Sequence, residues 1–401
     1  MLSLFRLALD KIMLENPHTN LMKTGSKRHF GNKRNEEFTM TYNELLDELR
    51  GKLGDSREEN ENILRDEAER YAKEGNEDGI KAAGELLLEN MSPEKREEIE
   101  RITHIDGVRL DEMYRQINQL ISEHKIVEAK PLAERLYKKI IVEFKESEKA
   151  KFVSLRNPFE DNLCQFHHEY NKVLTRTPFD FASYITTYAY VLIETGSPLD
   201  AIPVLEAAMS FNPVDCGPKF ELAEVYKLLG NRKKLFEITR ETLRVASSPM
   251  AIARCYANVG YILVDAGEFE DAIIFYTASA MFYPNPAIPH EIRHASDLMG
   301  KPAVRPSHEK ILETMKKYDI EYGPNQDVIS VAAQLAADCL NREDIYNAVQ
   351  AMKITYNLTL DEKVKELILK YDPQSARIVP QTNSEIDAVS GRNAKAPENN
   401  N

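Results

Sequence analysis

The chain has 401 residues, of which 42% are hydrophobic and 29% are charged, so it is long enough and apolar enough to bury a core. Its 65 acidic residues outnumber its 52 Lys and Arg residues, and the formal net charge is -13. This balance argues against a protein that wraps nucleic acid or coats an anionic membrane, since both associations draw their affinity from basic surface.

Cysteine usage favours a reducing compartment, and hydropathy argues against a membrane-spanning protein. The 4 cysteines lie far apart and include no Cys-x-x-Cys pair, which argues against both a disulfide framework and a structural zinc site. No apolar run approaches the roughly 20 residues that span a bilayer. We therefore expect a cytoplasmic protein with reduced thiols, no transmembrane segment and no cofactor.

Both ends of the chain differ in composition from its centre. Residues 1–39 form a basic leader that we expect to be disordered, and residues 373–401, rich in Pro, Asn, Gly and Glu, are predicted to form a disordered polar tail. Met40 opens directly into a helix-start signal. A translation start at Met40 is therefore a hypothesis beside a start at Met1.

An acidic helical region with degenerate repeats is predicted for residues 40–148. Its last part, residues 110–145, reads as an amphipathic helix pair in which Pro131 should lie in the first turn of the second helix. Clustered Pro and Phe residues then mark residues 149–180 as a connecting segment.

The centre of the chain repeats itself. Gly196, Gly230 and Gly267 recur at intervals of about 34 to 37 residues, a period typical of stacked helical hairpins. Small residues occupy the positions where two helices of a hairpin must approach closely, and large residues fill the remaining space. The small positions are Ala189 and Gly260 on first helices, and Ala201, Ala208, Ala272 and Ser279 on second helices.

These residues resemble the tetratricopeptide repeat family, whose small and large positions are matched by residues 182–215 and 253–286. The intervening residues 216–249 keep the phase but are degenerate in the second helix. The resemblance implies an all-α fold, a right-handed superhelical array of antiparallel helix hairpins over residues 181–372.

In this family the first helix of each repeat lines a concave groove that binds a peptide or another protein. Carboxylates at the matching positions favour a basic or neutral peptide. The aromatic rings among them are candidate anchors, although the same rings could pack beneath the next helix. The matching positions are Thr186, Tyr190 and Glu194, then Phe220, Glu224 and Lys227, then Arg254, Asn258, Tyr261 and Asp265.

One string has a catalytic pattern. Residues 290–294 read His-Glu-Ile-Arg-His, similar to the zincin metallopeptidases, in which His290 and His294 would share a zinc ion and Glu291 would act as base toward bound water. No third ligand completes the extended pattern, and no strand pattern precedes it. The simpler interpretation is a solvated first helix of a degenerate repeat.

The sequence therefore predicts a non-catalytic scaffold that binds a partner protein or peptide in the groove of the array. An alternative is a peptide-sensing regulatory protein, in which a bound peptide changes how the helices of residues 40–145 dock. A zinc-dependent hydrolase using residues 290–294 is the remote alternative.

Overall fold

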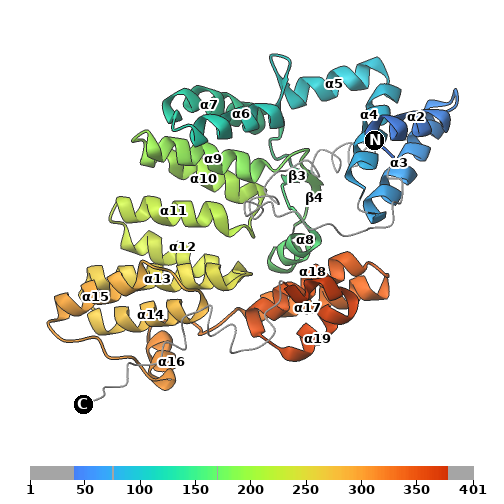
Figure 1. The fold of residues 1–401 in the computed structure, drawn as a ribbon. Coiled ribbons are helices and arrows are strands. Elements are labelled where there is room, and N and C mark those ends of the chain that lie inside the picture. Colours follow the sequence, from blue (N-terminus) through green and yellow to red (C-terminus); the bar gives the residue numbers. More distant parts are fainter. Residues whose placement is uncertain (1–39, 75, 169, 378–401) are drawn as a thin grey trace. The chain divides into compact units, whose positions relative to one another are not determined.

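The computed structural model describes residues 40–74, 76–168 and 170–377. This part of the chain consists of α-helices with two short two-stranded ladders, which confirms the predicted all-α class (Figure 1). The predicted leader of residues 1–39, and residues 378–401 of the predicted tail, lie outside the described residues. Within the described chain, no helix combines the length and apolar character needed to cross a membrane.

The chain divides into two compact units. Among the described residues, unit 1 holds those up to Arg156 together with Asn171–Val191, and unit 2 holds Asn157–Tyr170 together with the residues from Leu192 onward. The predicted domain borders stay a prediction.

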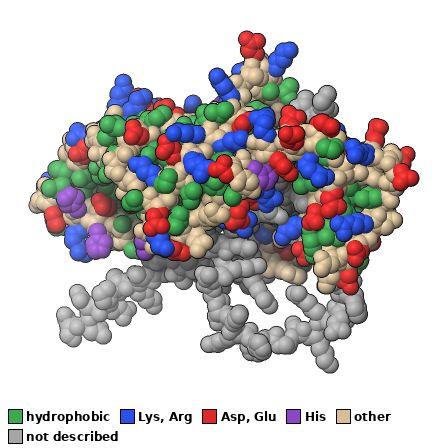
Figure 2. Space-filling view, turned by 90° about the horizontal axis from the view of Figure 1, so that it is seen from above, with side chains coloured by type: hydrophobic (Ala, Val, Ile, Leu, Met, Phe, Trp, Pro, Cys, Tyr) green, Lys and Arg blue, Asp and Glu red, His purple; other side chains and the backbone are tan. Residues whose placement is uncertain are grey.

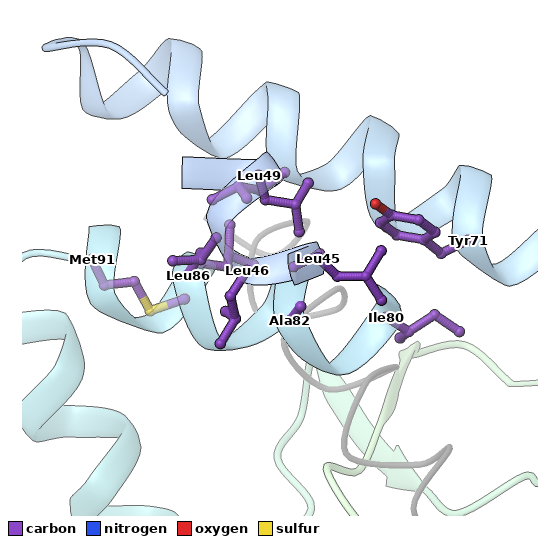
Figure 3. Close-up of a cluster of buried hydrophobic side chains, with 11 residues drawn as sticks. Leu45, Leu46, Leu49, Tyr71, Ile80, Ala82, Leu86 and Met91 are labelled. Carbon is purple, nitrogen blue, oxygen red and sulfur yellow. The ribbon is translucent and has the colours of Figure 1, made fainter. Parts of the chain in front are cut away.

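Unit 1 begins with three helices that share one core, α2 (Tyr42–Gly51), α3 (Arg57–Glu74) and α4 (Glu77–Asn90). A capping box starts α2: the Glu44 carboxylate accepts from the Thr41 amide at 2.7 Å, and the Thr41 hydroxyl accepts from the Glu44 amide at 3.4 Å. Leucines of α2 pack against apolar side chains of α3 and α4 (Figure 3). A Cβ on Gly79 would lie 2.4 Å from the Tyr71 ring, so this glycine allows the close approach of α3 and α4.

The rest of unit 1 contains further helices and both ladders. These elements are α5 (Pro93–Thr103), the antiparallel strands β1 (His104–Ile105) and β2 (Val108–Arg109), α6 (Leu110–Ser122), α7 (Ile126–Glu143), and the parallel strands β3 (Ala150–Val153) and β4 (Val173–Arg176). The helical pair over residues 110–145 is confirmed, but the place given to Pro131 is wrong, because α7 already begins at Ile126. Pro131 cannot donate to the carbonyl of Val127, and Val127 is 78% exposed, so water can satisfy that carbonyl.

Unit 2 is a succession of helices with short turns. They are α8 (Pro158–His167), the last turn of α9 (Phe181–Glu194), α10 (Pro198–Phe211), α11 (Cys216–Leu228), α12 (Arg232–Val245), α13 (Pro249–Ala266), α14 (Phe269–Phe282), α15 (Ile288–Met299), α16 (His308–Lys317), α17 (Gln326–Asn341), α18 (Ile345–Thr359), α19 (Glu362–Tyr371) and a 3-10 turn at Pro373–Arg377. From α10 to α15 each helix packs on the next (Figure 1).

The turn glycines and the small positions behave as the repeat predicts. Gly196, Gly230 and Gly267 have φ of 79°, 64° and 82°, the left-handed region in which other residues are strained. A Cβ on Gly260 would lie 2.8 Å from the ring of Tyr276, so the absence of a side chain at Gly260 allows α13 and α14 to approach this closely. The antiparallel hairpins α11–α12 and α13–α14 are thereby confirmed.

Beyond α15 the succession changes direction. The segment between α15 and α17 contains Pro302, Pro306 and Pro324, and α17 packs against α8 and approaches α12 (Figure 1). α8 is joined to the repeats by Glu160, whose carboxylate accepts a hydrogen bond of 2.8 Å from the buried amide of Asn212. The C-terminal helices of unit 2 therefore close against earlier elements of the same unit.

Candidate peptide-binding surface on α11 and α13

The first helices α11 and α13 bring five of the predicted groove residues into one network. The guanidinium of Arg254 lies 4.4 Å from the centre of the Phe220 ring, a cation–π contact, and donates to the Glu224 carboxylate at 3.4 Å. Lys227 donates to the same carboxylate at 2.9 Å, and its ammonium lies 5.4 Å from the centre of the Tyr261 ring. We call these five residues, Phe220, Glu224, Lys227, Arg254 and Tyr261, the α11–α13 surface.

The two aromatic rings of this surface differ in access. Tyr261 is 39% exposed, so a partner can reach its ring. Phe220 is 8% exposed and is covered by Arg254. Of the two rings, only Tyr261 is available as an anchor without a prior movement of Arg254.

Asn258 lies between Arg254 and Tyr261 on the same stripe of α13, since residues four and three apart share a helix face. Its side chain is 2% exposed, and within the described structure its Nδ2 has no hydrogen-bond partner. A buried donor without a partner costs about 1 to 3 kcal/mol. This amide is therefore a donor without an acceptor in the described structure, and a peptide carbonyl can reach it only after the side chains that cover it move.

Sequence reasoning missed Glu221, which follows Phe220 on α11. Burial raises the pKa of this carboxyl, Arg254 partly opposes the rise, and the carboxylates of Glu224 and Glu194 add to it. Within the described chain, no cation lies within ion-pair distance of Glu221. Phe220, Glu224 and Lys227 of the same helix were predicted from helical spacing. The desolvation of Glu221 depends on the adjacent helix, so it leaves no signal in the sequence.

The remaining predicted groove residues lie elsewhere or have local partners. Thr186 and Tyr190 belong to unit 1, where the Thr186 hydroxyl donates to the Ala182 carbonyl of its own helix at 2.7 Å and Tyr190 is half-buried. Glu194 is exposed at the end of α9, and Asp265 forms an ion pair with Arg232. That these four belong to one groove with the α11–α13 surface stays a prediction.

One face of the molecule carries mixed charge. Figure 2 shows acidic and basic side chains interspersed over one face of the molecule, without a field of a single sign.

The string at residues 290–294 lies on α15. His290 and His294 are exposed, and Glu291 accepts a hydrogen bond of 3.3 Å from the hydroxyl of Tyr276. Burial raises the pKa of Tyr276, and the nearby Glu291 carboxylate adds to the rise, so this hydroxyl keeps its proton. Throughout the described residues, no three His, Cys, Asp or Glu side chains come together in a way that could hold a metal ion.

Comparisons with known proteins leave the family open. No protein-family profile and no curated protein matches the chain. Among solved structures, one described as "Functional Characterization of Pseudomonas Aeruginosa pilF" is similar over 52% of this chain and 96% of its own, with 18% sequence identity and a TM-score of 0.27. A similarity of this size establishes neither a shared family nor a shared function.

Proposed function

We propose that the protein is a tetratricopeptide-type scaffold of the cytoplasm that binds a partner protein or peptide on the α11–α13 surface, without turnover. The observation that carries the proposal is the accessible ring of Tyr261 beside the network of Lys227, Glu224 and Arg254. The repeat pattern of residues 182–215 and 253–286 supports it independently.

A bound peptide would satisfy the groups that the free protein leaves without partners. An apolar side chain of the peptide would pack on Tyr261, an amphipathic ring of the kind enriched at binding hot spots. A backbone carbonyl would accept from Asn258 once the side chains that cover this amide move. A lysine or arginine of the peptide would pair with Glu221, relieving the repulsion among neighbouring carboxylates. The proposed ligand is therefore an extended or helical segment with a basic side chain next to an apolar one.

The proposal is tested by peptide selection and titration. Peptides selected from a random display library on the immobilised chain are titrated against wild type, Tyr261→Ala and Asn258→Ala. Loss of an anchoring tyrosine is expected to weaken binding at least about fivefold. Tyr346→Ala is the matched control, because Tyr346 is 72% exposed on α18, away from this surface.

Two results would contradict the proposal. One is a set of selected peptides whose affinities fall equally in the Tyr346→Ala control. The other is binding that survives both Tyr261→Ala and Asn258→Ala unchanged, with circular dichroism showing that the variants remain helical.

The peptide-sensing alternative is favoured by one feature, the separate set of helices over residues 40–145 that precedes the repeats. Hydrogen exchange of α6 and α7 with and without a selected peptide tests this alternative. Unchanged exchange at saturating peptide would exclude the peptide-sensing alternative, and the scaffold function would be the one that remains.

A further inference from the structure

A pocket of unit 2 lies apart from the residues of the α11–α13 surface, between α12 and the segment that leads into α17. Its volume is ≈ 650 Å³, within the roughly 300 to 1,000 Å³ typical of small-ligand sites. One wall is α12, with Arg240 and Arg244 one helical turn apart; the other carries Asp319, Glu321 and Asp327.

The acidic wall is held in place by a buried tyrosine of α13. The Tyr256 hydroxyl donates to the carbonyl of Glu321 at 2.9 Å and accepts from the amide of Gly323 at 2.8 Å. Gly323 has φ of 107°, a conformation that other residues rarely adopt. The adjacent Tyr322 ring packs edge-on against Phe282, with ring centres 5.4 Å apart. The wall therefore has a fixed shape without any ligand.

Charges in the pocket are partly neutralised by neighbours. Three ion pairs involve lining residues: Arg240 with Asp319 at 2.5 Å, Lys234 with Glu237 at 3.0 Å, and Lys219 with Glu241 at 3.6 Å. Within the described chain, the lining residues Arg244, Glu321 and Asp327 form no ion pair. One positive and two negative groups thus remain available to a ligand.

The histidine that interacts with two lining residues does not change this balance. His167 of α8 interacts with Arg244 and Asp327, and burial lowers its pKa, with Asp327 opposing the shift and Arg244 adding to it. Because its ordinary pKa is about 6.5, a lowered value keeps the imidazole neutral at pH 7.

We propose that this pocket binds a short free peptide of about two or three residues that carries one basic side chain, a size suited to its volume. Such a ligand has two positive groups, its ammonium and its basic side chain, and one carboxylate. The carboxylate pairs with Arg244, whose guanidinium can hold both oxygens, and the two cations pair with Glu321 and Asp327. The pocket shares no residue with the α11–α13 surface, so this inference does not depend on the proposed scaffold function.

The inference is tested by calorimetric titration of the full chain with glycyl-arginyl-glycine. Loss of charge-assisted hydrogen bonds in Glu321→Gln/Asp327→Asn is expected to weaken binding about tenfold or more. Arg244→Gln should bind the free peptide and its C-terminal amide equally, whereas wild type should prefer the free carboxylate. Glu309→Gln is the control, since Glu309 is exposed on α16 outside the pocket and should bind as wild type does.

Four outcomes would overturn the inference. The first is the absence of saturable binding to wild type at about 10 mM peptide, where even a very weak site would be occupied. The second and third are equal binding of glycyl-glutamyl-glycine and equal binding of the N-acetylated peptide, which lacks the ammonium. The fourth is an unchanged Kd in a Glu321→Gln/Asp327→Asn variant with wild-type circular dichroism.

Discussion

The hydroxyl of Tyr256 offers the sharpest test of how the pocket wall is held. Tyr256→Phe removes only this hydroxyl and leaves its buried ring in place, so the Glu321 carbonyl loses a donor and the Gly323 amide loses an acceptor. A polar group left without a partner costs about 1 to 3 kcal/mol when buried. Gly323 is only half-buried and Glu321 is exposed, so water can partly replace the hydroxyl.

We therefore expect the lower part of that range, about 1 to 2 kcal/mol, as a loss in the free energy of local opening of residues 319–325. Such a loss speeds exchange of the Gly323 amide roughly 5- to 30-fold. Hydrogen exchange followed by NMR or mass spectrometry measures this change in the segment itself, which avoids assuming that a chain of two units unfolds in one step.

Tyr346→Phe is the matched control, because the Tyr346 side chain is 72% exposed and its exchange pattern should not change. An unchanged rate at Gly323 in Tyr256→Phe would refute the reasoning. So would an equal acceleration along the whole of α13, because it would mean that the hydroxyl stabilises the helix and not the wall.

Three further changes test the repeat packing and the α11–α13 surface. Gly260→Ala should destabilise unit 2 by about 1 to 2 kcal/mol in urea denaturation, because the overpacking against Tyr276 costs about 1 to 3 kcal/mol and exceeds the helix-propensity gain of alanine. Gly51→Ala is the control: its Cβ would meet no atom within 4 Å, so it should be neutral or slightly stabilising. Equal effects of the two substitutions would contradict the packing argument. Asn258→Ala should leave the denaturation midpoint unchanged or slightly raised, because it removes a buried donor without an acceptor in the described structure while the lost packing offsets part of that gain, and it should weaken peptide binding; a large loss of stability would mean that the amide has a structural partner. Glu221 has a raised pKa in the folded state, so its ionisation destabilises that state. The stability that the protonated carboxyl contributes should be lost as pH rises through the folded pKa, which lies above the ordinary value of 4.5. Glu221→Gln should therefore reduce the fall in stability between pH 4.5 and 7, and an unchanged pH profile would show that another group is responsible.

The α11–α13 surface illustrates how far helical spacing leads. The stripes of α11 and α13 follow from the sequence, because residues three and four apart share a face of a helix. Spacing does not say which side chains cover one another. Arg254 covers Phe220, and Glu221 is partly desolvated, because of how the helices are positioned along one another's axes. That position is set by their packing and not by the spacing within either helix.

Local chemistry determined most of the repeat architecture. Gly196, Gly230 and Gly267 end helices because only glycine enters the left-handed region without strain, and Gly260 faces Tyr276 because the two helices need a small residue there. These requirements act within one or two turns of chain or between neighbours in sequence. They therefore leave a periodic pattern that can be read without the structure.

The tertiary structure alone decided the contacts between distant segments. The parallel pairing of β3 with β4, the packing of α8 on α17 and the pocket between α12 and residues 319–327 each join parts of the chain that no repeat period connects. Their side chains are ordinary surface types in the sequence. Only the close approach of the segments gives Arg244, Glu321 and Asp327 a common pocket, because the interaction of charges depends on their distance in space and not on their separation along the chain.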